Sequence, residues 1–538
     1  MRFRVPELCL CVAVTSCGRH PTTSDSSDAS PETSAPLGDA STGPVAVQDS
    51  TSTISDRQPL IGLNGKPSLA GAALPSTGKR IFARSLRTWV YESPHTSAAK
   101  LGAIRLGGSV AVKPEQVGRD GCPGGFYAII PDGFVCRGDD ATLDENDSLV
   151  RVGAEYPPDV FRRLPYFYGT VRKPGPIYRK LPDRDERRAA EPDIDKRMKS
   201  WLAAPGEIGA AYGQNLWTDG GAEPPDPTRA WESQQSDTIP WFLTDRKVAP
   251  LLPGKVKPDS ELVFGHMEPR VGYSILKTFL YEGRRYGITT DLLIVPTDRL
   301  RAIQGSSFHG FRIPEEADFP FAIVRLPGAH FFQFDREKNK LVAKGEASYR
   351  SVVKLTGKQN FFKNRLHFET AEGLWVSDKD ASRLDRARKM PAWGKNGEKW
   401  IDVNVTKQTL VLYEGTNPVY ATLVSTGEAG LEDAEHTTAT RRGIFRIHTK
   451  YLTATMSSDE AGEEFELRDV PYVQYFEDGY ALHGAYWHDR FGVPKSHGCI
   501  NLAPEDARRL FFWTEPSLPT AFHAVLKPLK GTVIFVHQ

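Results

Sequence analysis

A cysteine and three histidines lie close together near the end of the chain and could carry out covalent chemistry. Residues 482–488 read LHGAYWH, and residues 496–501 read SHGCIN. A thiol with a pKa of ~8.5 is only a few per cent ionised at neutral pH, so a nucleophilic cysteine needs a base or positive surroundings. His483, sixteen residues before Cys499, could take the thiol proton and later deliver it to a leaving amine. The pattern therefore predicts acyl transfer with Cys499 as nucleophile and His483 as general base.

The neighbours of the cysteine have predicted roles of their own. Gly498 permits a sharp turn, so that the amides of Gly498 and Cys499 could converge on a developing oxyanion. Asn501 could hydrogen-bond the loop and hold that turn. For His497 we hypothesise support of the site through hydrogen bonding.

Alternating apolar residues predict the elements that position this segment. Ile401, Val403 and Val405 alternate with polar residues, and after residues 406–408 the alternation resumes through residue 412, which predicts a hairpin. Further strands are expected at 420–424, 444–448, 472–476 and 533–536. A helix is expected over residues 503–513, with Pro504 in its first turn and a weak positive dipole near the cysteine.

The combined pattern resembles the catalytic domain of the L,D-transpeptidases. That family has a histidine followed, at about this distance, by Ser-His-Gly-Cys-apolar-Asn. The resemblance covers about 140 residues and includes the hairpin from residue 401, Ser425-Thr426-Gly427, and residues 440–447. Arg441 stands where the family usually has proline, which puts only the local geometry of a strand entry in doubt.

The resemblance implies a fold, a reaction and further site residues. The fold would be mainly β, a β-sandwich with a short helix after the catalytic cysteine. Cys499 would attack the carbonyl of diaminopimelate, the third residue of a peptidoglycan tetrapeptide stem, and expel the terminal D-alanine. The thioester would pass to another stem, giving a 3→3 crosslink, or to a D-amino acid, a protein lysine or water. No cofactor is implied, and the Gly484 carbonyl would orient His483.

Substrate contacts are expected from Tyr472, Ser496 and Asn501, although Tyr472 could equally be core. Met456 is a candidate lid residue. Trp487 and His488 would lie on a loop between the two halves of the motif, where His488→Ala should keep most of the activity.

Three other functions fit parts of the pattern. Zinc could bind the four residues His483, His488, His497 and Cys499, but a single glycine between the last two does not match the usual ligand spacings, and zinc would quench the nucleophile. A sortase-like transpeptidase would need an essential arginine, yet Arg508 and Arg509 lie on the expected helix. A catalytically inactive wall-binding module would not need the intact His483–Cys499 pair.

The N-terminus resembles a bacterial lipoprotein signal. Arg2 and Arg4 precede an apolar stretch at 8–14, and Val14-Thr15-Ser16 leads to Cys17, which would be lipidated. Residues 1–17 would then be the signal, and the protein would be exported to the periplasm or cell envelope and anchored to a membrane at Cys17. A disordered cytosolic tail is the alternative.

The remaining cysteines are consistent with export. Cys9 and Cys11 would leave with the signal, while Cys122 and Cys136 could pair in an oxidising compartment. Cys499 is left unpaired, which suggests chemistry, although an inert buried thiol is the ordinary alternative.

Length and charge balance predict several domains and no nucleic-acid partner. The chain has 538 residues, and its 68 Lys plus Arg balance 67 Asp plus Glu. No apolar run approaches the ~18 residues that span a bilayer. Hairpin patterns at 126–135, 285–295 and 367–376 mark three small β units that resemble SH3-like barrels, or simply β structure that positions the enzyme. The expected division is a tether at 18–78, β units at 79–150, 151–310 (with an insertion at 185–260) and 311–395, and a catalytic domain at 398–538.

Overall fold

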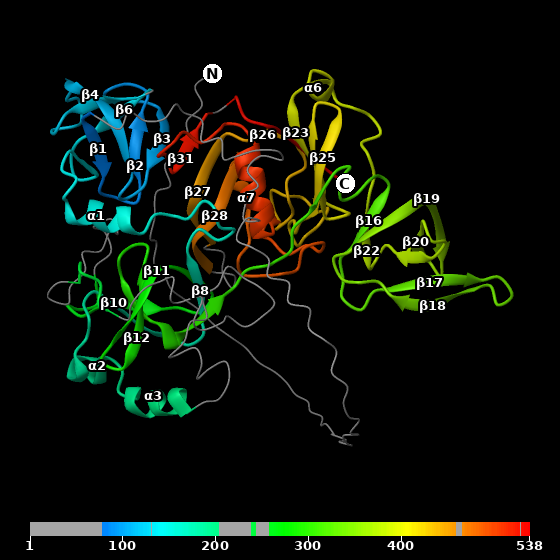
Figure 1. The fold of residues 1–538 in the computed structure, drawn as a ribbon, viewed down its shortest axis with the longest axis horizontal. Coiled ribbons are helices and arrows are strands. Elements are labelled where there is room, and N and C mark those ends of the chain that lie inside the picture. The colour runs from blue at the N-terminus through cyan, green and yellow to red at the C-terminus, as the bar shows by residue number, and fades with distance from the viewer. Residues whose placement is uncertain (1–77, 131, 204–237, 244–257, 459–464, 528) are drawn as a thin grey trace, which may run out of the picture. The chain divides into compact units, whose positions relative to one another are not determined.

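The computed structural model describes residues 78–538 except 131, 204–237, 244–257, 459–464 and 528. Strands dominate this part of the chain, and its helices are short (Figure 1). The expected signal and nearly all of the expected tether lie outside the described residues, as does much of the 185–260 insertion. Among the helices that are described, none has the length and apolar character needed to cross a membrane.

The C-terminal domain contains a six-stranded sheet built around the expected hairpin. Ile401 pairs with Leu412 across that hairpin, and the last strand runs parallel to its first strand. The strands follow the order β15 (Phe311–Arg312), β25 (Asn417–Leu423), β24 (Thr409–Glu414), β23 (Lys399–Asn404), β32 (Val533–His537) and β26 (Gly443–Arg446). The range expected for the third β unit, 311–395, began at the two residues of β15, for which no strand was expected. Two residues are too short to show a periodic pattern, and the place of β15 in this sheet corrects that boundary.

A second set of strands carries the reactive segment. It comprises β27 (Thr449–Ser458), β28 (Phe465–Glu477), β29 (Tyr480–Gly484), β30 (Ile500–Leu502) and β31 (Ala524–Leu526). The expected helix follows β30 as α7 (Pro504–Trp513). Ala507, Leu510 and Phe511 of α7 are fully buried in one apolar core with residues of both sheets. The mainly β fold with a short helix after the cysteine is therefore confirmed.

The first β unit is built from short antiparallel strands that pair in the order β7-β1-β4-β5-β6-β2-β3. β1 pairs with β4 and β7, β5 with β4 and β6, and β2 with β6 and β3. β3 also pairs with β31, which joins this unit to the catalytic strands. The elements are β1 (Arg80–Ala83), β2 (Thr88–Tyr91), β3 (Lys100–Ile104), β4 (Ser109–Gly118), β5 (Phe126–Ile129), β6 (Phe134–Cys136), β7 (Ala141–Thr142) and α1 (Ser148–Glu155).

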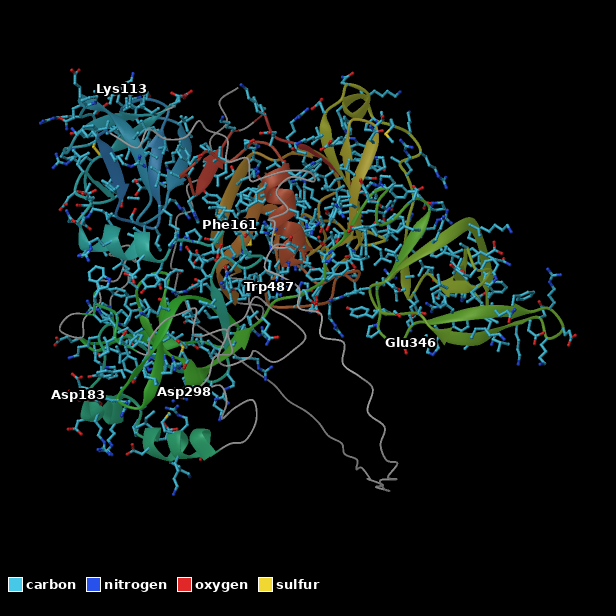
Figure 2. The ribbon with its side chains drawn as sticks, in the orientation of Figure 1. Lys113, Phe161, Asp183, Asp298, Glu346 and Trp487 are labelled. Carbon is cyan, nitrogen blue, oxygen red and sulfur yellow. A yellow bond between two sulfur atoms is a disulfide. The ribbon has the colours of Figure 1, made fainter. Side chains whose placement is uncertain are left out.

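The second β unit also pairs with the catalytic strands, because β11 runs parallel to β28. Arg284 is buried between Glu191 and Asp298, and Asp298 is labelled in Figure 2. The elements are β8 (Phe167–Val171), β9 (Gly175–Tyr178), α2 (Arg184–Ala190), α3 (Ile194–Ala203), β10 (Val263–Met267), β11 (Val271–Tyr281), β12 (Arg284–Thr289), β13 (Ile294–Pro296), a 3-10 turn η3 (Thr297–Arg299) and β14 (Leu300–Ile303).

The third β unit is a seven-stranded sheet followed by a short helix. Its strands follow the order β18 (Lys340–Glu346), β17 (His330–Asp335), β21 (Trp375–Ser377), β20 (Arg365–Thr370), β19 (Val352–Phe362), β16 (Phe321–Val324) and β22 (Ala381–Leu384), and α6 (Ala392–Lys395) precedes β23. All three hairpins expected in the β units are present, since β5 pairs with β6, β12 with β13 and β20 with β21.

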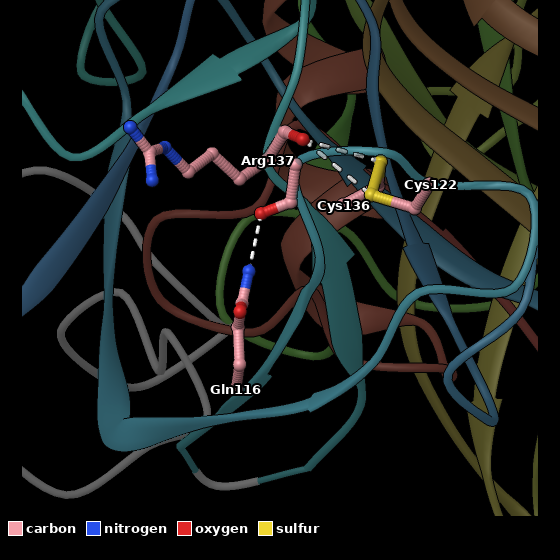
Figure 3. The surroundings of a disulfide bond; sticks show 5 residues. Gln116, Cys122, Cys136 and Arg137 are labelled. Atoms are coloured by element: carbon pink, nitrogen blue, oxygen red, sulfur yellow. Dashed lines mark hydrogen bonds between the residues drawn. A yellow bond between two sulfur atoms is a disulfide. The ribbon is translucent and has the colours of Figure 1, made fainter.

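A disulfide joins Cys122 and Cys136, as the cysteine pattern suggested (Figure 3). The carbonyl of Arg137 lies 3.4 Å from the sulfur of Cys122, and the side-chain amide of Gln116 donates to the Gly124 carbonyl beside it. The bridge joins the connection between β4 and β5 to the end of β6. Cys499 is the free cysteine of the described chain.

Candidate active site

Cys499 lies immediately before β30, at the end of a tight turn. Its side chain is partly exposed, and its sulfur lies 3.7 Å from the Gly479 carbonyl, to which the thiol can donate. Burial of the surroundings raises the pKa of the thiol to about 11, against the opposing effect of a backbone hydrogen bond from Ala481. The thiol is therefore protonated near neutral pH and needs a base to become a nucleophile.

The turn before Cys499 is held by hydrogen bonds from both sides. Gly498 has a φ of +124°, and a Cβ added to it would lie 2.9 Å from Cε1 of Tyr480, so only glycine fits. The Gly498 amide donates to Ser496 Oγ at 3.2 Å, and this hydroxyl donates to the Cys499 carbonyl at 2.5 Å. Thr440 Oγ1 donates to the Gly498 carbonyl at 2.8 Å. Ser496 thus braces the turn rather than facing a substrate, and the Gly498 amide is already engaged instead of free for an oxyanion.

His483 lies on β29, which pairs in parallel with β30. Its register partner is Asn501, two residues after Cys499. Because side chains alternate along strands, those of His483 and Cys499 share one face, with Cα positions about 8 Å apart for ideal strand spacings. The imidazole is 3% exposed, and burial lowers its pKa to about 4. It is therefore neutral at pH 7, as a general base must be.

Two neighbours set the surroundings of the His483 ring. The indole of Trp487, labelled in Figure 2, lies with its centroid 5.6 Å from the imidazole at an angle of 34°. Nδ1 of His483 is buried and makes no hydrogen bond of ordinary geometry within the described chain, although the Gly484 backbone opposes the lowering of its pKa. A Cβ on Gly484 would lie 3.0 Å from Cγ of Pro471, so this glycine also permits close packing behind the base.

His488, on the loop between β29 and β30, contacts the side chain of Asn501. Nε2 of His488 lies 2.9 Å from Nδ2 of Asn501, and Nδ1 of His488 accepts from the Arg490 amide at 3.2 Å. Burial lowers the pKa of His488 to about 4. Asn501 is only 1% exposed, and its side chain contacts His488 instead of the turn at Gly498 that it was expected to hold.

Two other predicted site residues lie elsewhere. Tyr472 is fully buried, its hydroxyl donates to the Arg162 carbonyl at 2.5 Å, and its ring packs against Phe511. The family resemblance suggested a substrate contact for Tyr472, with a core position as the alternative, and the structure shows the core position, with a φ of +58° at this residue. His497 is exposed, with its ring centroid 5.2 Å from that of Phe465.

The sequence did not identify several aromatic side chains around Cys499. Tyr475 and Tyr480 are close enough for the cysteine to raise the pKa of each phenol, after the larger effect of burial. Cys499 packs against one apolar core cluster, together with the partly buried side chains of Tyr451, Met456, Phe465, Tyr475 and Trp487. Met456 packs against the same cluster as Cys499, and its role as a lid residue stays a prediction. Residues 459–464, between β27 and β28, lie outside the described residues.

The histidines of the zinc alternative do not assemble into a ligand set. Both ring nitrogens of His488 face hydrogen-bond partners, and His497 lies against Phe465. In the described ranges, no group of three or more His, Cys, Asp or Glu side chains is placed to hold a metal.

Comparison with known proteins gives a family match over the C-terminal domain. The L,D-transpeptidase catalytic domain family, YkuD, matches residues 398–536. A curated relative is YciB of Bacillus subtilis strain 168, whose name assigns it to the L,D-transpeptidases. It is 27% identical over 151 residues, which is 23% of this chain and 63% of the relative.

Solved structures of L,D-transpeptidases are also similar over part of the chain. A mutant of the Enterococcus faecium enzyme is 23% identical and covers 26% of this chain and 50% of its own, with a TM-score of 0.21. A protein of Stackebrandtia nassauensis is 27% identical and covers 29% and 58%, with a TM-score of 0.19. This chain thus spans less than two thirds of the length of each of these three relatives. Residues 398–536 of the chain form an L,D-transpeptidase catalytic domain of the YkuD family.

Proposed function

We propose that the chain is a peptidoglycan transpeptidase that forms a thioester on Cys499. The observation that carries the proposal is the placement of the neutral His483 imidazole and the protonated Cys499 thiol on one face of two paired strands. A thiol with a raised pKa beside a base with a lowered pKa favours proton transfer during attack over a stored ion pair.

In the first half-reaction, Cys499 Sγ attacks the diaminopimelate carbonyl of a tetrapeptide stem while His483 accepts the thiol proton. The Cys499 amide can donate a hydrogen bond to the developing oxyanion, whereas the Gly498 amide already donates to Ser496 Oγ. The C–N bond to D-alanine then breaks, and the imidazolium delivers its proton to the leaving amine. This leaves an acyl thioester and a neutral histidine.

In the second half-reaction, an acceptor attacks the thioester and loses its proton to His483. The C–S bond breaks, and the sulfur regains that proton. We propose a second stem as the acceptor, giving a 3→3 crosslink, with exchange for a free D-amino acid, a protein lysine or water as the other outcomes of the product analysis.

The experiment is incubation of the purified protein with a tetrapeptide stem, with D-alanine release and the products followed by mass spectrometry. Cys499→Ala should release no D-alanine, and His483→Ala should be slowed by about 10²–10⁴-fold. His330→Ala, which changes an exposed histidine of the third β unit, is the matched control and should keep the wild-type rate. Release by Cys499→Ala at the wild-type rate would contradict the proposal.

We also propose that the protein is exported and lipidated at Cys17, and that its β units, of SH3-like type, bind cell wall or position the enzyme. Supporting the first proposal are the small residues before Cys17 and the disulfide between Cys122 and Cys136, because disulfides persist in oxidising compartments. Metabolic labelling with a fatty-acid probe should tag the wild type and not Cys17→Ser. Equal labelling of both proteins would end the lipidation proposal.

A further inference from the structure

We propose that His488 is a positioning residue of the active site, which donates a hydrogen bond from Nε2 to the side chain of Asn501 and so fixes the face that carries His483 and Cys499. This inference rests on the proposed function for its kinetic test. It reverses the expectation that His488 is a dispensable loop residue.

The contacts of His488 tie it to the strands instead of leaving it free above them. Its Nδ1 accepts from the Arg490 amide at 3.2 Å, and its ring lies 5.1 Å from that of Phe491, which is almost fully buried. Its Nε2 lies 2.9 Å from the Asn501 amide group, thirteen residues further along the chain. The side chain therefore bridges the loop and β30.

The chemistry of a neutral imidazole gives this bridge a direction. Burial keeps His488 neutral at pH 7, so one ring nitrogen accepts a hydrogen bond and the other carries the proton. Nδ1 is the acceptor, because it faces the N–H of Arg490. Nε2 must then donate, and the Asn501 amide can accept only through its oxygen.

The surroundings of Asn501 fit the same assignment. With Nδ2 facing His488, the Oδ1 atom of Asn501 is buried without a partner among the described residues. Turning the amide by 180° places Oδ1 against the Nε2–H group and gives the oxygen a donor. The hydrogen-bond requirements of both side chains thus select the Nε2–H tautomer of His488.

Fixing Asn501 matters because of where it lies. It is the register partner of His483 and follows Cys499 by two residues. Its backbone is already held by hydrogen bonds in both directions with Ser425, each of 2.9 Å, so His488 supplies the restraint on its side chain. The residue before His488 is Trp487, whose ring lies against His483. Loss of the Nε2 contact would loosen both Asn501 and the Trp487 ring that lies against His483.

Two substitutions separate this contact from the contact that holds the loop. In His488→Asn the short amide can still accept from Arg490 but cannot reach Asn501. In His488→Gln the longer amide can donate to Asn501. We expect His488→Asn to lower kcat for D-alanine release by about 10- to 100-fold with little change in KM, since small misplacements in an active site cost up to about 10². His488→Gln should recover most of kcat, and both variants should keep a Tm close to that of the wild type.

Each result decides the matter. Wild-type kcat in His488→Asn would overturn the inference, and so would equal losses in both variants with a lowered Tm, because that would show a purely structural role. An assay-independent readout is the ¹⁵N NMR spectrum of His488 in the wild-type protein, which should show a protonated Nε2 and an unprotonated Nδ1. The opposite tautomer would overturn the inference. A wild type without D-alanine release but with the expected tautomer would count against the proposed function alone.

Discussion

His483 lies directly opposite Asn501 in the parallel pairing of β29 with β30, which puts the base on the same face as Cys499 two residues earlier. Parallel strands with a fixed register hold two side chains more firmly than loops can. The reactive pair is therefore organised by backbone hydrogen bonds, and the loop between the two strands adds Trp487 and His488.

The reactivity of Cys499 should depend on pH as expected for a protonated thiol. Burial raises its pKa to about 11, and burial lowers that of His483 to about 4, so no thiolate–imidazolium pair is stored at pH 7. We expect the rate of iodoacetamide labelling at the Cys499 peptide to rise about tenfold per pH unit from pH 7 to 10 and to level off only near 11, as the thiolate fraction dictates. A plateau below pH 8, read by peptide mass spectrometry, would instead reveal a preformed ion pair.

Gly498→Ala should abolish acylation without unfolding the protein. The residue has a φ of +124°, and an added Cβ would approach Tyr480 to 2.9 Å, so the turn that presents Cys499 must shift. Gly265→Ala is the matched control, because the backbone there is ordinary and the space around it is open. The comparison requires D-alanine release and Tm for each variant. Full activity in Gly498→Ala would show that the turn geometry is not essential.

Substitution of Asp469 should strongly lower the free energy of unfolding, because this carboxylate lies where three parts of the fold meet. It pairs with Arg105 of the first unit at 2.8 Å, and it accepts hydrogen bonds from Ser274 at 2.5 Å and from Thr453 at 2.7 Å. Asp469→Asn leaves a buried arginine without its counterion, which typically costs about 3–5 kcal/mol of unfolding free energy. Asp195→Asn, in an exposed pair with Arg188, should cost no more than about 1 kcal/mol. Urea unfolding of both variants tests the difference, and equal stabilities would contradict it.

The same carboxylate gives the stability a defined pH dependence. Burial opposes its ionisation, but Arg105 and the hydroxyl donors prevail and lower the pKa of Asp469 to about 2. A carboxylate with a lowered folded pKa stabilises the fold fully above its unfolded pKa of about 3.9. That contribution is lost as the pH falls through 2. Asp469→Asn should therefore flatten the acid limb of the stability curve.

The Cys122–Cys136 disulfide should stabilise the first β unit. It closes a loop with a sequence separation of 14, for which loop entropy gives about 3 kcal/mol. A variant with both cysteines changed to alanine should lower the free energy of unfolding of this unit by up to that amount and leave D-alanine release unchanged. Reductant should have the same effect on the wild type and none on the variant. If reductant also destabilised the variant, its effect on stability would not come from this disulfide.

The hairpins, the strands and α7 could be predicted because local alternation and a proline at a helix start encode them. The placement of His483 and Cys499 on one face was also accessible, through two short motifs at a fixed spacing, while their roles as base and nucleophile stay predictions. The burial of Tyr472 was left open, since the resemblance offered a substrate contact as well as a core position, and sequence alternation does not reveal a left-handed residue inside a strand.

The roles of Ser496, Asn501 and His488 depend on tertiary contacts that spacing cannot report. Each has a side chain typical of a substrate contact, yet each is used to hold backbone or another side chain. The pairings of β3 with β31 and of β11 with β28 were equally inaccessible, because strand patterns do not name their partners.

The most direct test of the account is the intact mass of the protein during reaction with a tetrapeptide stem. The wild type should gain the mass of the stem less D-alanine, and digestion should place that adduct on the peptide that contains Cys499. Cys499→Ala should gain nothing, while His330→Ala should match the wild type. An adduct of the same mass on Cys499→Ala, or on another residue of the wild type, would contradict the assignment of Cys499 as the nucleophile.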